Sequence, residues 1–543
     1  MLIGNRRVET AQKIPSINPA TLEVNGEASL ASSDECRAAV EAARKAFPFW
    51  RESPQAEKKK IFLRAKRILL DRSREIAKLI TREKGSPYAE SLAVEVFAAL
   101  EALDYYSKDP ERTLAPKKGK HHLALLLHKK SSFHFQPLGP TLLISPWNFP
   151  FLIPILDSLS ALAGGNTLVL RPSTLTPFSA IMIGEIFAAA GLPPGVLNIV
   201  ICRVPQAEEM VTNPQIQTVM FTGSVPTGKR IMELASRNLT NVTLELGGKD
   251  PMIVLKDADL ERSSRGAVWG AFMNASQSCA SIERAYVARE VIDEFTERVL
   301  DLTRKLKVGN PLEPGTDMGP MASLGQLRVV EDHLADAQAK GAQLLYGGKR
   351  VGDLPGHFIL PAVLTGVDHS MKIMKEETFG PTLPIMTFSE PEEALALAND
   401  SAYGLTASVW TRNKSSAAWL TERLETGTVT INDHMITFAE PRAIWGGIKQ
   451  TGRGRSHGPY GLHDLVNIKY VSHDYAKKKT QLWWFPYDLG MAKFMERSLA
   501  YFHHGRMRNK TLALFSLLAH LPRIKRASPL LNLVKSLPRL FGR

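Results

Sequence analysis

Cys279 lies in the segment NASQSCAS (274–281), where its neighbours are small or polar. A cysteine that fills a hydrophobic core normally has apolar neighbours. A thiol that small polar groups leave open can instead act as a nucleophile once its proton is removed. The simpler interpretation is an unreactive thiol in a loop, so the rest of the chain has to decide between the two.

Two other side chains could assist a nucleophilic thiol. Glu245 in LELGGKDP (244–251) precedes two glycines, and a carboxylate on such a turn can swing toward a neighbouring site as a general base. Asn148 in SPWNFP (145–150) lies between two aromatic residues, where its amide could donate a hydrogen bond to a developing oxyanion. Taken alone, a surface Glu and an Asn turn before a helix explain these residues equally well.

A phosphate-binding turn is a further candidate. In FTGSVPTGKRIMELA (221–235), Gly223, Ser224 and Gly228 lie where a strand passes into a helix, and glycines there let the backbone approach an anion at the helix N-terminus. The spacing differs from G-x-G-x-x-G, so an ordinary tight turn is the alternative. Arg171 ends the run TLVLR (167–171) and could contact a ribose or phosphate, or be a solvated loop residue.

The elements that must position these groups alternate between strand and helix. Short apolar runs at 141–145, 167–171, 196–200, 218–223 and 242–246 are separated by helical patterns, which indicates parallel strands with crossover helices. A second series follows Cys279, with strands at 285–289, 358–365, 406–410 and 427–432 and helices at 291–306 and near 324–340. Residues 34–109 are expected to form three helices.

The composition limits the class of protein. A chain of 543 residues, 44% hydrophobic and 22% charged, is typical of a soluble protein with more than one domain. Cys36, Cys202 and Cys279 form no close pair in the sequence, which favours a reducing, cytoplasmic compartment and argues against disulfides or a zinc site. No secretory signal is visible, nor the roughly 18 to 20 continuous apolar residues of a membrane span.

The motifs in their order carry a resemblance to a known family. PWNFP, FTGSxxxG, ELGGK, a cysteine 34 residues after Glu245, and EETFGP (376–381) follow one another, with INPAT (17–21) before them and WGGIKQTGRGRSHGPYGL (445–462) after them. Together they resemble the aldehyde dehydrogenase superfamily over about residues 15 to 475.

The resemblance implies a role for each candidate residue. It implies that Cys279 adds to an aldehyde carbonyl as a thiohemiacetal, that Asn148 and the Cys279 backbone N–H bind the oxyanion, and that Glu245 activates water to hydrolyse the thioester left after hydride transfer. It also implies that NAD or NADP is the cofactor, with no metal. The cofactor-binding residues so implied are Trp147, Arg171, Ser173, Thr174, Gly223, Ser224, Gly228, Glu377 and Phe379.

Two departures from the family pattern stand out. The family often has Lys-Pro-Ser-Glu where this chain has RPST (171–174). Thr174 removes a carboxylate that would repel the 2′-phosphate of NADP, and Arg171 keeps a cation nearby, so NADP should be accepted and could be preferred. Ser276 replaces a usual glycine, and a small residue there should preserve the loop.

The predicted fold class is α/β, with two open Rossmann-like domains. A cofactor-binding domain is expected over 1–121 and 137–246 and a catalytic domain over 247–447. A small β arm or bridging segment over 122–136 and 448–474 is expected to form a homodimer or tetramer, by resemblance. A basic amphipathic helical extension is expected over 475–543.

The extension carries most of the net charge. Residues 475–543 contain 14 Lys plus Arg against Asp488 and Glu496, or +12 of the total +14, which leaves +2 for the other residues. Short apolar runs between the cations are typical of helices that lie on an anionic membrane surface, here at the inner face of a membrane. Packing of these runs on the protein itself is the main alternative, and nucleic-acid binding is the less favoured one.

Such a location suits a medium- or long-chain aliphatic aldehyde, and fatty aldehyde dehydrogenases have a similar hydrophobic extension. A semialdehyde or phosphorylated aldehyde is the alternative substrate, which would require a cation in the substrate tunnel. A catalytically silent protein that binds membranes or polyanions is the alternative outside enzymes, and the intact trio of Cys279, Glu245 and Asn148 argues against it.

Overall fold

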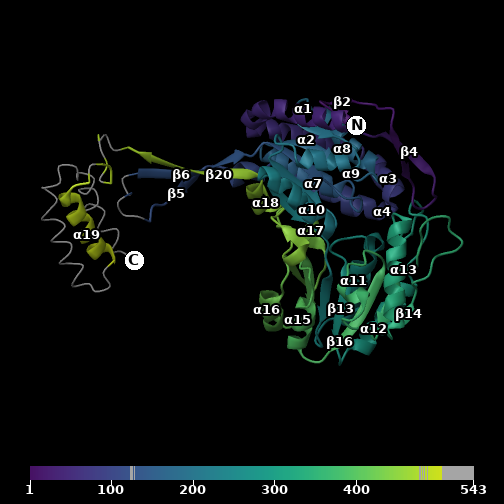
Figure 1. Cartoon of the computed structure of the whole chain (residues 1–543). Coiled ribbons are helices and arrows are strands. Elements are labelled where there is room, and N and C mark those ends of the chain that lie inside the picture. Colours follow the sequence, from purple (N-terminus) through teal and green to yellow (C-terminus); the bar gives the residue numbers. More distant parts are fainter. Residues whose placement is uncertain are drawn as a thin grey trace. The chain divides into compact units, whose positions relative to one another are not determined.

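The computed structural model describes residues 1–503 except 123–125, 127–128, 476–478, 480, 482 and 486. The chain forms two compact units (Figure 1). One comprises Met1–Leu114 and Gln136–Asn467, and the other comprises Ala115–Phe135 and the chain from Ile468 onward. The first unit contains two separate open α/β sheets, so the predicted fold class is confirmed.

The first sheet has the strand order β19-β11-β10-β7-β8-β9-β1-β2. Its five central strands are parallel and match the five predicted ones. They are β7 (Pro140–Ile144), β8 (Thr167–Arg171), β9 (Leu197–Ile199), β10 (Thr218–Thr222) and β11 (Asn241–Glu245). The antiparallel edge strands are β1 (Leu2–Ile3), β2 (Arg6–Arg7) and β19 (Gly452–Arg453). β7 and β9 are buried along their whole length, as expected for parallel strands covered by helices.

The helices packed with this sheet are α1 (Ser33–Glu52), α2 (Gln55–Asp71), α3 (Ser73–Lys84), α5 (Phe97–Tyr106), α7 (Leu152–Ala163), α8 (Pro177–Ala189), α9 (Val204–Val211), α10 (Val225–Ala235) and α18 (Gly458–Asp464). A capping box of Ser32 and Glu35 fixes the start of α1. A hairpin of β3 (Lys13–Ile17) and β4 (Val24–Ser29) precedes it.

The expectation of three helices over 34–109 is wrong. Gly85, with a φ of 93°, ends α3, and Pro87 then starts the short helix α4 (Tyr88–Glu90). A π-helix (Ser91–Val96) follows before α5, and α6 (Asp109–Thr113) comes last. The helical period in the sequence missed this boundary, because the left-handed Gly85 and the following Pro87 interrupt the helix without disturbing the apolar spacing.

The second sheet has the order β14-β15-β16-β13-β12-β17-β18 and its own hydrophobic core. Its strands are β12 (Asp250–Val254), β13 (Ile282–Ala288), β14 (Gln343–Tyr346), β15 (Ala362–Thr365), β16 (Thr382–Phe388), β17 (Thr406–Trp410) and β18 (Thr428–Ile431), all parallel except β14. Its helices are α11 (Leu260–Phe272), α12 (Ile292–Arg304), α13 (Leu324–Ala339), α14 (Lys372–Lys375), α15 (Pro391–Asn399), α16 (Lys414–Arg423) and α17 (Ile436–Ala439).

The other unit contains a three-stranded sheet in the order β20-β6-β5, in which β5 and β6 are antiparallel. Its strands are β5 (Lys117–Gly119), β6 (Lys129–Pro137) and β20 (Val466–Asp474). Residues 448–467, expected with this arm, group with the first unit, because β19 pairs with the last two residues of β11. Of the predicted extension 475–543, the structure describes α19 (Leu489–His503) and part of the segment before it, and residues 504–543 lie outside the described part. Among the described helices, none is long and apolar enough to cross a bilayer.

Candidate functional site

The site is a cavity of about 310 Å³ between the edges of the two large sheets. Parallel strands bring the ends of neighbours to one edge, and in an open sheet ligands bind beyond the carboxyl ends where the strand order reverses. That reversal occurs at β7, and the segments that follow β7, β10 and β11 all reach the cavity. The opposite wall comes from segments that precede β12, β13 and β16, which are neighbours in the second sheet.

Eight of the twelve predicted site residues line this cavity. They are Trp147, Asn148, Gly223, Ser224, Glu245, Cys279, Glu377 and Phe379. The other four, Arg171, Ser173, Thr174 and Gly228, do not.

Cys279 is the only cysteine of the three that is not buried; Cys36 and Cys202 are both in the core. The small polar side chains before it are themselves buried, because hydrogen bonds within the loop satisfy many of them. Gln277 shows how: its Nε2 donates to the Asn274 carbonyl at 2.9 Å, and its Oε1 accepts the Ala322 N–H at 2.8 Å. The loop is therefore a rigid frame that leaves the thiol at the cavity wall.

The electrostatic setting of Cys279 favours the neutral thiol. Although Cys279 is partly exposed at the cavity wall, the surrounding protein desolvates its thiol and raises the pKa well above its usual range, and the nearby carboxyl groups of Asp250, Glu377 and Glu245 raise it further. Burial also raises the pKa of Asp250 and of Glu377, each to about 8. The site therefore carries several exchangeable protons at neutral pH.

Glu245 is the last residue of β11 and is 6% exposed. Both of its carboxyl oxygens are without a hydrogen-bond partner among the described residues. Burial raises the pKa of this carboxyl well above its usual range, with a further upward contribution from Asp157 and an opposing one from Arg455. An unpaired buried carboxyl with high proton affinity can accept a proton from a molecule that enters the cavity.

Asn148 follows β7 and is 3% exposed. Its backbone carbonyl accepts a hydrogen bond from the side-chain amide of Asn274 at 3.0 Å, which links it to the Cys279 loop. Its side-chain carbonyl has no partner among the described residues. The predicted trio of Cys279, Glu245 and Asn148 thus lines one cavity, although the residues lie on three different segments.

Glu377 and Phe379 lie just before β16 and line the cavity opposite the first sheet. Glu377 Oε1 accepts the Gly248 N–H at 3.0 Å. The ring of Phe379 packs edge-on against Trp147, with 5.6 Å between their centroids. The two aromatic rings form one end of the cavity lining.

Lys249 and Glu283 are functional-site residues that the sequence reasoning missed. They form a buried ion pair, and Glu283 also accepts the N–H groups of Thr378 and Phe379 at 2.8 and 2.9 Å. Phe379 has a left-handed φ of 51°, which these hydrogen bonds help to hold. Lys249 is the lysine of ELGGK, so the motif contained the signal, but its partner is 34 residues away and could not be identified from spacing.

The predicted phosphate turn has two separate parts. Gly223 and Ser224 line the cavity at the N-terminus of α10, where free N–H groups favour an anion. Gly228 lies inside α10, and a Cβ there would come within 2.5 Å of the Leu246 side chain. A glycine at position 228 therefore allows the helix to pack closely against the segment after β11.

Arg171, Ser173 and Thr174 lie at the end of β8 and in the turn after it, outside the cavity lining. Arg171 is partly exposed, and its Nη2 donates to the Cys202 carbonyl at 2.9 Å while its Nε has no partner among the described residues. β8 is the neighbour of β7, so this cation lies at the same carboxyl edge of the first sheet as Trp147.

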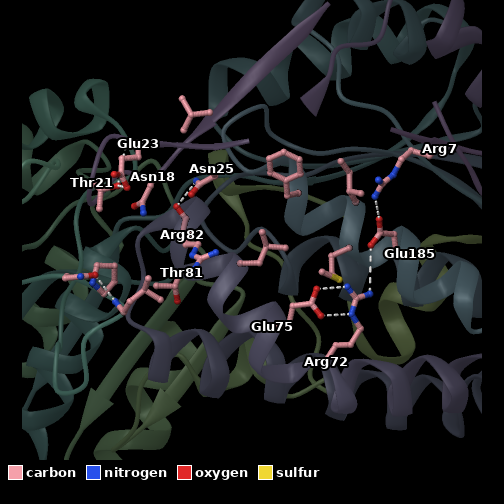
Figure 2. Close-up of a pocket in the computed structure, with 18 residues that line it drawn as sticks. Arg7, Asn18, Thr21, Glu23, Asn25, Arg72, Glu75, Thr81, Arg82 and Glu185 are labelled. Atoms are coloured by element: carbon pink, nitrogen blue, oxygen red, sulfur yellow. Dashed lines mark hydrogen bonds and ion pairs between the residues drawn. The ribbon is translucent and has the colours of Figure 1, made fainter. Parts of the chain in front are cut away.

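A second cavity, of about 630 Å³, contains none of the predicted site residues (Figure 2). Two of its ion pairs are Arg7 with Glu185 at 2.7 Å and Arg72 with Glu75 at 2.7 Å, and Arg82 and Glu23 also line the cavity. Its arginines are thus accompanied by glutamates, and among the described residues no helix N-terminus with cavity-lining glycines is found there as in the first cavity.

A thiol, an unpaired carboxyl and a helix N-terminus around one cavity are groups that a nucleotide-dependent oxidoreductase can use. The aldehyde dehydrogenase family model matches residues 7–471, and the chain belongs to this family. It is an aldehyde dehydrogenase that uses NAD or NADP.

Individual relatives cover most of the chain. Succinate-semialdehyde dehydrogenase [NADP(+)] of Escherichia coli is 36% identical over 85% of this chain and 94% of its own. The 4,4′-diapolycopene aldehyde oxidase of a Methylomonas species is 38% identical over 82% and 83%. The crystal structure of the NAD-dependent aldehyde dehydrogenase of Sinorhizobium meliloti has a TM-score of 0.85 and 34% identity, and covers 89% of this chain and 96% of its own.

The raised pKa of Cys279 gives a testable pH dependence. Below its pKa the thiolate fraction rises about tenfold per pH unit. We expect the alkylation rate of Cys279 by iodoacetamide, followed by peptide mass spectrometry, to rise in this way from pH 7 to 9. At pH 9, where Glu377 is ionised, Glu377→Gln should react faster because a repelling charge is removed. Buried Cys36 and Cys202 serve as internal controls, and a rate that levels off below pH 8 would contradict the assignment.

Proposed function

We propose that this site oxidises an aldehyde to its carboxylic acid through a covalent intermediate on Cys279. The single observation that carries the proposal is the convergence of Cys279, Asn148 and Glu245 on one cavity of about 310 Å³. Each residue type supplies what such a reaction needs: a nucleophile, an oxyanion donor and a base.

The first half of the reaction forms a thioester. The deprotonated sulfur of Cys279 adds to the carbonyl carbon, and the oxygen that gains charge accepts hydrogen bonds from the Asn148 amide and the Cys279 backbone N–H. NAD or NADP, when bound, supplies the hydride acceptor. Loss of a hydride from the former aldehyde carbon leaves an acyl group on the sulfur of Cys279.

The second half hydrolyses the thioester. Glu245 accepts a proton from water, the oxygen of that water adds to the acyl carbon, and the Cys279 thiolate leaves as the carboxylic acid forms. The two carboxyl oxygens of Glu245 have no partner among the described residues and are free to contact such a water. The raised pKa of Glu245 favours proton uptake. The base must be ionised to act, so hydrolysis should become faster as the pH rises.

Gly223, Ser224, Trp147, Glu377 and Phe379 are proposed to hold the cofactor. The α10 N-terminus suits a pyrophosphate, and the Trp147 and Phe379 rings offer an aromatic wall to a planar ring. A carboxylate at Glu377 could accept hydrogen bonds from ribose hydroxyls.

We propose further that NADP is accepted and preferred. Arg171 and Thr174 lie at the carboxyl edge of the first sheet, where a cation and a neutral hydroxyl would tolerate a 2′-phosphate. Ser173 lies between them and has a hydroxyl to offer the same group. The E. coli relative is named as NADP-dependent, which is consistent with this choice.

For the substrate we propose an apolar aldehyde of medium or long chain length. Phe149, next to Asn148, lies 6.2 Å from the ring of Phe438, which in turn lies 4.9 Å from Trp445. Met435 contacts the hydroxyl of Ser278, beside Cys279, at 3.8 Å. None of these four apolar residues lines the cofactor cavity, and three of them, Phe149, Met435 and Trp445, are buried. We propose that the substrate chain packs against this apolar cluster.

The apolar cluster continues outward to exposed residues. Trp269 on α11 and Ile436 on α17 are 47% and 56% exposed. The two segments adjoin, because a Cβ at Gly270 would come within 2.6 Å of His434. An exposed apolar rim of this kind is typical of a site that receives an apolar ligand.

A semialdehyde remains the alternative, and the name of the E. coli relative favours it. Its carboxylate would need a free cation near the apolar cluster. Among the described residues, the buried Lys and Arg side chains all have other partners. Lys84 and Lys249 pair with glutamates, Arg284 binds backbone carbonyls, and Lys58 lies over the Trp50 ring.

We also propose that the C-terminal extension places the enzyme at an anionic membrane surface. In its described part, Trp484, Phe485, Tyr487 and Leu489 are 53%, 79%, 63% and 80% exposed. Aromatic residues beside a segment of charge +12 suit the boundary between headgroups and acyl chains. An enzyme held there would meet apolar aldehydes where they partition.

Assembly as a dimer or tetramer is proposed through the β20-β6-β5 sheet. β20 is exposed along most of its length, with Ile468 and Tyr470 about half exposed. An exposed strand that carries apolar side chains is suited to pairing with a second copy.

Substitution of the trio separates its roles. We expect Cys279→Ala to abolish reduction of the cofactor, followed by absorbance at 340 nm. Glu245→Gln should still give a burst of about one reduced cofactor per site and then stall, since only the hydrolytic step needs the base. Normal steady-state turnover by Glu245→Gln would refute the assignment of the base.

The apolar rim can be tested by chain length. Loss of roughly 50 to 100 Å² of apolar contact weakens binding by about 1 to 2.5 kcal/mol. We therefore expect Trp269→Gln and Ile436→Gln to raise the KM for decanal about tenfold and leave that for propanal nearly unchanged, in assays with both cofactors. Leu70→Gln, an exposed leucine on α2, is the matched control. Faster turnover of succinate semialdehyde than of decanal by the unmodified enzyme would favour the alternative.

Membrane association is tested with vesicles. Full-length protein should pellet with vesicles rich in phosphatidylserine and stay in solution with phosphatidylcholine vesicles. Combined substitution of Trp484, Phe485 and Tyr487 by serine should release most of it. Phe49→Ser with Leu239→Ser, exposed apolar residues of the first unit, is the control. Equal sedimentation with both vesicle types would rule out the membrane role.

A further inference from the structure

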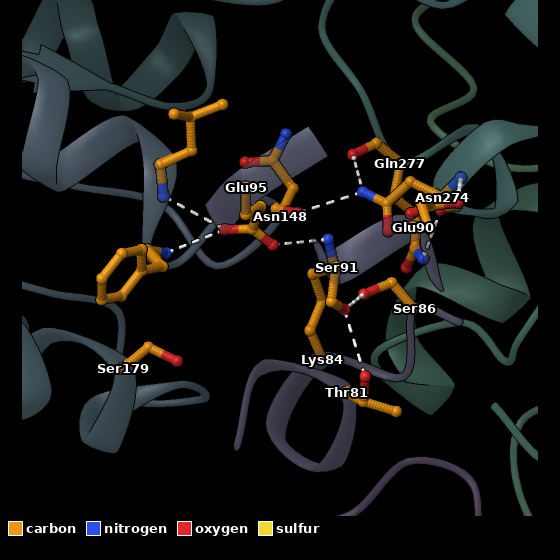
Figure 3. Close-up of polar contacts among 12 residues, drawn as sticks. Thr81, Lys84, Ser86, Glu90, Ser91, Glu95, Asn148, Ser179, Asn274 and Gln277 are labelled. Carbon is orange, nitrogen blue, oxygen red and sulfur yellow. Dashed lines mark hydrogen bonds and ion pairs between the residues drawn. The ribbon is translucent and has the colours of Figure 1, made fainter. Parts of the chain in front are cut away.

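One short segment, Glu90 to Val96, contacts both parts of the chain that carry the proposed oxyanion donors (Figure 3). The segment is a π-helix preceded by Glu90, and π-turns hydrogen-bond residue i to residue i+5. Glu90 and Glu95 are therefore stacked about one turn apart. Each uses a carboxyl oxygen to hold a different loop of the site.

Glu95 holds the Asn148 side. Its Oε2 accepts the N–H groups of Phe151 and Leu152 at 3.0 and 3.1 Å, at the start of α7 and three to four residues after Asn148. Its Oε1 pairs with Lys84 at 2.9 Å, and both of these charged side chains are almost completely buried. The start of α7, and with it the turn that carries Asn148, is fixed to the helical layer.

Glu90 holds the Cys279 side. Its Oε2 accepts the backbone N–H of Asn274 at 2.9 Å. The Asn274 side-chain amide then donates to the Asn148 carbonyl at 3.0 Å and to the Gln277 carbonyl at 2.9 Å. Asn274 thus joins the two loops directly.

We propose that Glu90 and Asn274 are positioning residues of this reaction, which set the place of the Cys279 backbone N–H relative to the Asn148 amide. The inference rests on the proposed function, in which these two groups bind one oxygen. Donors of an oxyanion site must converge within a few tenths of an ångström, and a shift of about 1 Å can cost about 100-fold in rate. Asn274 also has a left-handed φ of 56°, which asparagine tolerates better than most residues.

The test uses paired variants of the full-length enzyme. Glu90→Gln keeps an acceptor for the Asn274 N–H, whereas Glu90→Met removes it at similar size. Asn274→Gly keeps the left-handed backbone but removes the amide that bridges the loops. Glu101→Met, at an exposed position of α5, is the matched control.

We expect Glu90→Met and Asn274→Gly each to lower kcat for aldehyde oxidation about 10- to 100-fold, with the KM for cofactor within twofold. Glu90→Gln should stay within threefold of the unmodified enzyme. The double variant should be little worse than the poorer single one, since both changes act through the position of one residue, Asn274. Alkylation of Cys279 by iodoacetamide forms no oxyanion and should change less than twofold in all of them.

Two results would overturn the proposal. Equal losses in Glu90→Gln and Glu90→Met would show that the acceptor is not what matters, and a parallel loss of alkylation would indicate general damage to the loop. If Glu90→Met does not fold, Asn274→Gly alone decides, and unchanged kcat there would refute the role. Asn148→Ala distinguishes failure of the positioning role from failure of the proposed function. Normal kcat in that variant would refute the oxyanion assignment itself.

Discussion

The left-handed turn before Cys279 is the constraint on which the site depends. Asn274, Ala275 and Ser276 have φ values of 56°, 51° and 59°, and for residues other than glycine each such conformation costs about 1 to 2 kcal/mol. The turn persists because hydrogen bonds from several directions leave the chain no other path, chiefly through Asn274 and Gln277. Because of this turn, the polar side chains of the loop are buried while Cys279 lies at the cavity wall. A regular helix or strand would not place these side chains in this way.

The same burial that fixes the loop sets the proton affinity of the groups around it. Glu245 and Glu377 line one cavity with the thiol of Cys279, Asp250 is buried nearby, and burial raises the pKa of all four groups. Several negative charges in so small a space would repel one another, so the resting site holds protons instead. In the proposed mechanism Cys279 and Glu245 act in their deprotonated forms, so their raised pKa values predict a rate that increases with pH.

The sequence predicted the first sheet and most of the cavity because those signals are local. The five central strands are short apolar runs between turns, and Cys279, Glu245 and Asn148 each lie in a motif of a few residues. What it could not predict depends on contacts between distant positions. The Lys249–Glu283 pair and the hydrogen bond from Asn274 to Asn148 needed the folded chain, because spacing does not encode which loops meet. The predicted start of the C-terminal part of the β arm, at residue 448, differs from the structure for the same reason. Residues 448–467 belong to the first unit because β19 pairs with β11, which is far away in the sequence.

Two buried ion pairs support opposite walls of the site. Lys84–Glu95 fixes the start of α7 beside Asn148, and Lys249–Glu283 fixes the backbone of Phe379. Burying an ion pair costs desolvation that mutual attraction seldom exceeds, so such pairs are poor sources of stability. Each glutamate here, however, also accepts two backbone N–H groups at the end of a loop, which a neutral apolar pair could not do. We interpret both pairs as devices that fix loop geometry, which is what a site built from the ends of two separate sheets requires.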